Sequence, residues 1–304
     1  MTRAFPFSVR TAIFLASVCL LFTNSIAAQD DDVISVDSSM VLVNAAVLDH
    51  DGKPVRNLRK DQFKIFEDGR AQDISIFAAA EVPFAAAILI DTSGSMEERI
   101  SLARSAAIKF LEGLRVDDSA AIFRFDSKVE QVQDFSNSRD LNDRLFDLRS
   151  KGMTSLNDAI HRAAADLSKR TEKRKAIIVL SDGMDTMSKN SPDQAMKAAL
   201  EAGASIFTVD MSATDATGIQ RTQNQAILKK FAEKTGGTFV ATPGGVAMRD
   251  AFKAIVGDLG TQYTLGYQPS TAARDGRWHE IEVRVNKPNL TVRARKGYNA
   301  ERSK

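Results

Sequence analysis

Cysteine is almost absent from this sequence of 304 residues, and the single one, Cys19, lies in an N-terminal segment that we expect to be removed. A mature chain without cysteine excludes disulfides, a zinc–thiolate site and a thiol nucleophile. Histidine is scarce too: His50, His161 and His279 are scattered over an expected turn, helix and strand, and we expect no metal role for any of them. Stability must therefore come from packing, with a bound ion as a further source.

Residues 1–28 have the pattern of an export signal. Two arginines precede the apolar stretch 11–22, and small residues follow at Ala27 and Ala28, where cleavage is expected. The protein is then periplasmic or secreted. The alternative is a retained anchor in the inner membrane, because residues 11–28 approach the length of about 20 residues that spans a bilayer.

Excess charge is also lacking. The chain has 41 Lys and Arg against 39 Asp and Glu, and removal of Arg3 and Arg10 with the signal leaves the mature chain neutral. A nucleic-acid groove or a polybasic membrane surface needs clustered excess Lys and Arg. We therefore expect no nucleic-acid partner, and membrane contact only if the signal is retained as an anchor.

The mature sequence divides into three sections with different patterns. Short continuous apolar runs alternate with amphipathic segments over residues 82–260, which predicts a doubly wound α/β domain with a mostly parallel sheet and helices on both faces. The expected strands are 84–90, 120–125, 176–180 and 204–209, and the expected helices are 100–114, 156–167, 192–202 and 225–234.

The two flanks, residues 33–80 and 261–298, alternate apolar and polar residues and contain turn clusters, which is typical of strands. Neither flank alone buries enough apolar area to be stable. We therefore expect them to pair into one small β-sandwich-like module. The aromatic residues Trp278, Tyr263 and Tyr267 are expected to pack in its core.

Polar residues with oxygen ligands gather where the expected parallel strands end. Asp91, Ser93 and Ser95 follow the first strand, Thr154 lies in the loop before a helix, and Asp182 follows the strand 176–180. The carboxyl ends of parallel strands form the ligand-binding edge of such a sheet. Hydroxyls with only two carboxylates suit a hard cation, Mg2+ or Mn2+ with Ca2+ also possible, rather than zinc.

The Asp-x-Ser-x-Ser motif, with its downstream Thr and Ser-Asp-Gly, resembles the metal-ion-dependent adhesion site of von Willebrand factor type A domains. The flanking segments 41–43, 58–69, 263–267 and 292–298 resemble bacterial exported proteins related to that family. The resemblance implies that the hydroxyls bind the metal directly or nearly so and that the acids act largely through water. It also implies a coordination position for a carboxylate from a partner.

These patterns predict an exported binding module in which a Mg2+ site captures an acidic side chain of a partner protein. One alternative is a structural or assembly scaffold of the cell envelope in which the ion only stabilises loops. Another is a sensor that shifts a helix near residues 245–259. The segment Asp91-Thr92-Ser93-Gly94-Ser95 can also be read as a simple strand-to-helix turn with a serine cap. We expect Asp126, Asp158 and Asp185 to lie around the site without binding the ion.

The motifs of several enzyme classes are absent. A phosphatase of the haloacid-dehalogenase type needs a second Asp where this chain has Ser93. The sequence has neither a Gly-x-Ser-x-Gly elbow nor a phosphate-binding Gly-x-x-x-x-Gly-Lys-Ser/Thr loop. We therefore expect neither an enzyme nor a small-molecule substrate.

Overall fold

The computed structural model describes residues 40–79, 82–138, 152–212, 218–241, 245–269 and 275–300. The expected signal peptide and Cys19 lie outside these described residues. No helix in the described ranges is long and apolar enough to cross a membrane.

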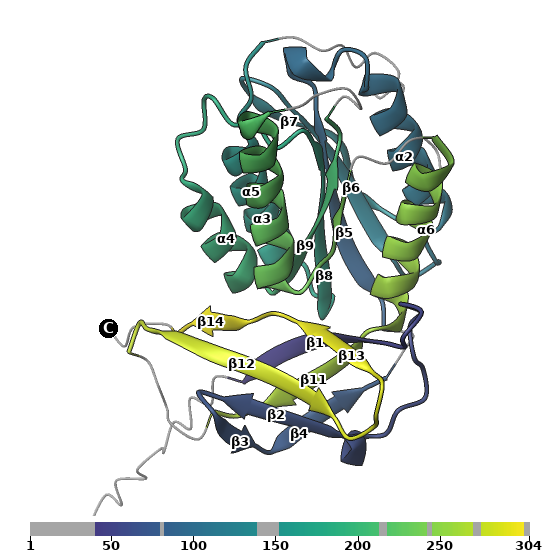
Figure 1. The fold of residues 1–304 in the computed structure, drawn as a ribbon, viewed down its shortest axis with the longest axis vertical. Helices are drawn as coiled ribbons and strands as arrows, with labels where there is room; N and C mark the ends of the chain where they lie inside the picture. The colour runs from purple at the N-terminus through teal and green to yellow at the C-terminus, as the bar shows by residue number, and fades with distance from the viewer. Residues whose placement is uncertain are drawn as a thin grey trace, which may run out of the picture. The chain divides into compact units, whose positions relative to one another are not determined.

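A six-stranded sheet forms the centre of the α/β part (Figure 1). All neighbouring strands are parallel except for the antiparallel pair β6 and β7 at one edge. The strand order is β10 (Phe239–Val240), β9 (Ala204–Asp210), β8 (Arg174–Ser181), β5 (Phe84–Asp91), β6 (Ser119–Phe125) and β7 (Val129–Ser136). The chain passes from β5 to β6 on one side and later returns to β8 on the other, so the winding reverses between β5 and β8.

Helices cover both faces of this sheet, each over its own apolar cluster. Helices α2 (Ile100–Glu112) and α6 (Gly245–Thr261) pack on one face. The other face carries α3 (Leu156–Ser168), α4 (Pro192–Glu201) and α5 (Ile219–Thr235). Strand β5 is buried along its whole length because both faces are covered. This architecture confirms the predicted doubly wound α/β fold.

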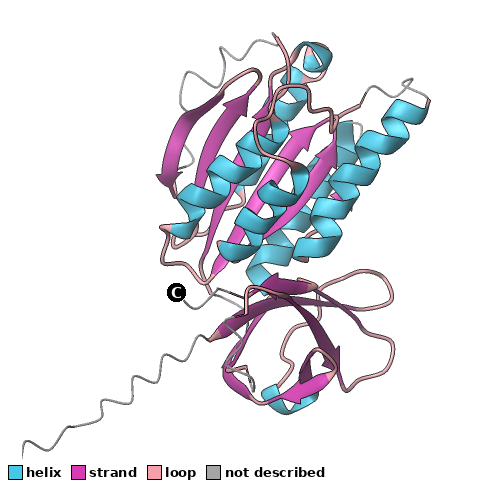
Figure 2. Ribbon diagram, turned by 90° about the vertical axis from the view of Figure 1, so that its left-hand side faces the viewer, coloured by secondary structure: helices cyan, strands magenta, loops and turns pink. Residues whose placement is uncertain are grey.

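The flanks form two four-stranded sheets that share one apolar core (Figure 2). One sheet has the order β13 (Thr291–Ala294), β1 (Val41–Leu48), β11 (Tyr263–Tyr267) and β4 (Ile74–Ala78). The other has the order β14 (Gly297–Asn299), β12 (Trp278–Val285), β2 (Phe63–Glu67) and β3 (Arg70–Gln72). Strand β1 pairs with β11 and β13, and β2 pairs with β12, so each sheet needs strands from both flanks.

One aromatic expectation is wrong. Tyr263 and Tyr267 are fully buried, as predicted, but Trp278 is 42% exposed. Strand β12 alternates between exposed and buried positions, and His279 takes the buried position next to Trp278. The indole instead covers Gly297, where an added Cβ would lie 2.4 Å from the ring.

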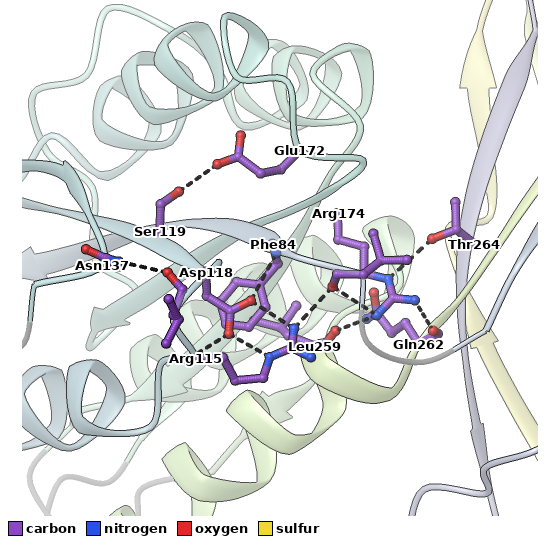
Figure 3. Close-up of polar contacts among 12 residues, drawn as sticks. Phe84, Arg115, Asp118, Ser119, Asn137, Glu172, Arg174, Leu259, Gln262 and Thr264 are labelled. Carbon is purple, nitrogen blue, oxygen red and sulfur yellow. Dashed lines mark hydrogen bonds and ion pairs between the residues drawn. The ribbon is translucent and has the colours of Figure 1, made fainter.

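A fully buried arginine joins the α/β part to the sandwich (Figure 3). Arg174, at the start of β8, donates hydrogen bonds to the carbonyl oxygens of Leu259 at 3.3 Å and of Gln262, near the end of α6. It also donates to the hydroxyl of Thr264 in β11 at 3.3 Å. The guanidinium thus satisfies backbone carbonyls that would otherwise be buried without donors.

Candidate metal centre at the carboxyl edge of the sheet

Asp91 ends β5 next to the point where the winding of the sheet reverses, and its side chain is fully buried. Ser181 Oγ donates to Asp91 Oδ2 at 2.6 Å, and the backbone N–H of Ser93 donates to Oδ1 at 2.9 Å. Burial raises the pKa of the Asp91 carboxyl to about 7, and the charge of Asp182 adds to the shift against these hydrogen bonds. The carboxylate is therefore costly to keep ionised without a nearby cation.

The two serines of the motif lie in the loop that follows β5. Ser93 precedes the short 3-10 turn η2 (Gly94–Met96), and its Oγ lies 3.2 Å from the Oγ of Ser95. Ser93 is buried whereas Ser95 is exposed, so the pair reaches from the interior to the surface. Two hydroxyl oxygens this close can coordinate the same cation.

The loop that carries Thr154 is tied to the serine loop by a hydrogen bond from the Gly94 N–H to the carbonyl oxygen of Gly152, at 3.1 Å. Thr154 is buried, and its own backbone is held by Thr186. The Thr154 N–H donates to Thr186 Oγ1 at 3.0 Å, and the Thr186 N–H donates to the Thr154 carbonyl at 2.9 Å. Thr186 thus fixes the segment from which the Thr154 hydroxyl projects.

Asp182 follows β8 in a tight turn. Its Oδ1 accepts a hydrogen bond from the Met184 N–H at 3.0 Å, and Gly183 has a φ of +81°. A Cβ at Gly183 would lie 2.7 Å from the carbonyl oxygen of Asn224, so both the dihedral and the space require glycine. This close packing fixes the turn that presents Asp182.

The structure thus brings the loops of all five predicted site residues to one edge of the sheet. The outer acids have other contacts: Asp185 accepts from the Asn157 N–H at 2.8 Å, and Asp158 accepts from the Asn190 N–H at 2.9 Å. Asp126 accepts from the Lys128 N–H at 2.9 Å. These carboxylates shape the surrounding loops.

Sequence reasoning missed two residues that support the site. Ser181, which bonds Asp91, was visible in the Ser-Asp-Gly segment but received no role. Thr186 has no signal in the sequence, because its contact with Thr154 joins loops 32 residues apart.

The donors fit a hard divalent cation. The side chains of Asp91, Ser93, Ser95, Thr154 and Asp182 offer oxygen atoms only. Within the described ranges, neither Asp91 nor Asp182 forms an ion pair with Lys, Arg or His. A buried carboxylate of this kind needs a counter-charge, and a divalent cation among these oxygens would supply it.

Among the residues that the structure describes, two other groups of His and acids have ligand atoms within 4.8 Å of one another. Asp49, His50 and Asp51 form one, which is largely exposed. In the other, which includes Glu67, His279 Nδ1 lies 2.8 Å from Asp68 Oδ2, so the imidazole already has a carboxylate partner.

Comparison with known proteins points to one family. The model of the von Willebrand factor type A domain matches residues 87–252. Inter-alpha-trypsin inhibitor heavy chain H3 of Bos taurus is 28% identical over 127 residues, which are 37% of this chain and only 14% of that protein.

The solved structures that are similar to this chain include two that extend over most of its length. The pilus adhesin SpaC of Lactobacillus rhamnosus GG, in an open conformation, has a TM-score of 0.50 at 10% identity, covering 81% of this chain and 49% of that one. A von Willebrand factor type A protein of Catenulispora acidiphila has a TM-score of 0.49 at 12% identity, covering 88% and 75% of the two chains.

Proposed function

Because this chain belongs to the von Willebrand factor type A domain family, we propose that it is an exported protein-interaction module with a divalent cation, Mg2+, at the carboxyl edge of its sheet. Asp91, Ser93, Ser95, Thr154 and Asp182 hold the ion. A partner protein presents an Asp or Glu side chain to it. The observation that carries this proposal is the buried Asp91 carboxylate, which lies beneath the hydroxyl loops and forms no ion pair with any Lys, Arg or His that the structure describes.

The residues of the proposed site lie at different depths below the surface. Asp91 is fully buried and supplies charge from below, while Ser95 is exposed at the surface of the same loop. Because three of the five donor residues, including the exposed Ser95, offer neutral hydroxyls, the bound ion would keep enough positive charge to attract a carboxylate from outside. Such an arrangement favours binding over catalysis, and no general base is positioned by these contacts.

Exposed methionines beside the site support a protein as the partner. Met153, next to Thr154, is 51% exposed, and Met187, whose N–H donates to the Thr154 carbonyl, is 47% exposed. Methionine adapts its shape to a partner surface. These two side chains would bury apolar area around the metal-bound carboxylate and so contribute to partner selection.

Isothermal titration of the mature chain with Mg2+, Mn2+ and Ca2+ tests the site. We expect saturable binding that Asp91→Ala and Thr154→Ala abolish. Asp193→Ala is the matched control, because Asp193 is an exposed acid of α4 that pairs with Lys230 of α5 at 3.0 Å and has no place in the site. Equal binding by wild type and both site variants would contradict the proposal.

The complete burial of Asp91 favours a second candidate, an envelope scaffold in which the ion only stabilises the loops. Binding of a purified acidic partner distinguishes the two. An interaction module loses binding in EDTA while its circular dichroism spectrum is kept, whereas a scaffold keeps its partner but melts at a lower temperature.

A further inference from the structure

A cavity of about 440 Å³ lies far from the metal residues, where the start of β8 and the end of α4 meet strands β1 and β14. Its volume falls in the range of small-ligand sites. The lining includes Arg295 and Tyr298 from the sandwich and Lys173 and Lys175 from the α/β part. None of these residues has a role in the proposed metal site.

Arg295 is a cation that pairs with no acid among the described residues. Its Nε is buried and has no hydrogen-bond partner. Nη1 donates a long hydrogen bond, 3.4 Å, to the carbonyl oxygen of Leu200, and Cζ lies 5.6 Å from the centre of the Tyr298 ring. Burial lowers the pKa of Arg295, and in the described part of the chain it forms no ion pair. A guanidinium in such a place normally has a carboxylate or phosphate partner.

The other charges of the lining leave the cavity positive. Glu172 is engaged by Arg170 at 2.7 Å, and Glu201 lies 3.7 Å from Lys197. Lys173 and Lys175 form no ion pair with any described residue. Burial lowers the pKa of Lys175, so this ammonium is partly withdrawn from water. The acids of the lining thus form ion pairs with other cations, while Arg295, Lys173 and Lys175 form none with any described residue.

We propose that this cavity binds an oxyanion, a carboxylate or a phosphate, through Arg295 together with Lys173 and Lys175. The simpler interpretation is that Arg295 only caps the carboxyl end of α4 through Leu200. That contact uses Nη1 but leaves Nε without an acceptor, and it does not explain the two lysines. An oxyanion would accept from Nε and bring negative charge to all three cations.

The test is titration of the mature chain with inorganic phosphate and, separately, with butyrate, at constant ionic strength and without divalent metal. We expect saturable binding of at least one probe, weakened about tenfold or more in Arg295→Met, since a charge-assisted hydrogen bond is lost. Arg295→Lys, which keeps the charge, should bind more tightly than Arg295→Met. The control is Arg284→Met, which removes an exposed arginine paired with Glu282.

The two probes identify the source of the anion, since binding of butyrate alone indicates a carboxylate and binding of phosphate alone indicates a phosphate ligand. Should Arg295→Met fail to fold by circular dichroism, Lys175→Met replaces it with an expected loss of several-fold. Absence of saturable binding for both probes, or unchanged binding in the folded variant, overturns the proposal. Neither result bears on the metal site, because divalent ions are absent from the assay.

Discussion

Replacing Asp91 with Asn should stabilise the metal-free protein while destroying its response to Mg2+. The carboxylate is fully buried, and its hydrogen bonds come from neutral groups, the Ser181 hydroxyl and the N–H and side chain of Ser93. Asparagine has the same shape and no charge, so it avoids the cost of burying an anion. The variant therefore separates the contribution of Asp91 to folding from its contribution to ion binding.

The size of this stabilisation follows from the pKa of Asp91, which burial raises from 3.8 to about 7. Below about pH 4 the carboxyl is protonated in both the folded and unfolded states. As the pH rises to about 7, only the folded state keeps the proton, so the free energy of unfolding falls by about 1.4 kcal/mol per pH unit. The total loss is about 4 kcal/mol, and the Asp91→Asn variant is spared it because its amide does not titrate.

Urea denaturation in EDTA at several values between about pH 4.5 and about pH 7.5 measures this difference. The free energy of unfolding of Asp91→Asn should exceed that of wild type by a margin that grows as the pH rises across that interval. Saturating Mg2+ should then stabilise wild type by about 2.7 kcal/mol at 100 times the dissociation constant, and leave the variant unchanged. The same dependence of the free energy of unfolding on pH in both proteins would refute the reasoning.

Three further substitutions test other contacts. His279→Gln should lower the free energy of unfolding by about 1–2 kcal/mol below about pH 6, because hydrogen bonds to carboxylates outweigh burial and raise the pKa of His279. Urea denaturation should show this loss fading as the pH rises through the raised pKa. Gly183→Ala should destabilise by about 2–3 kcal/mol and weaken Mg2+ binding, since its Cβ would press on Asn224; equal metal affinity would speak against the fixed turn. Arg174→Met should cost about 3–5 kcal/mol in the same assay by leaving buried carbonyls unpaired, and a loss below about 1 kcal/mol would contradict this role.

The sequence predicted those elements whose packing is reflected in a simple pattern. Strands such as β5 and β8 are buried on both faces and therefore appear as continuous apolar runs. Strand β7 was not predicted, because Val129–Ser136 is a half-exposed edge strand with apolar residues at a spacing of three. Helix α5 begins at Ile219 rather than at Gln225, since its first turns have little apolar periodicity.

For the candidate site, too, the sequence indicated only those residues that lie in a recognisable pattern. Asp91 and Asp182 could be proposed because each lies at the end of a recognisable strand, and the carboxyl ends of parallel strands share an edge. The hydrogen bonds between Thr186 and Thr154 could not be predicted, because they depend on how two loops fold over each other. The cavity beside Arg295 was equally hidden, since its lining comes from four elements that only the tertiary structure assembles.

The pairing of the two flanks has a consequence for the order of folding. Asn44 in β1 and Thr264 in β11 are hydrogen-bonded across 220 residues of chain, whereas the central domain is built from segments nearer in sequence. During synthesis the strands of the first flank emerge long before their partners, with their hydrogen-bonding edges open. The central domain should therefore fold first, and closure of the sandwich should be the slow, aggregation-sensitive last step.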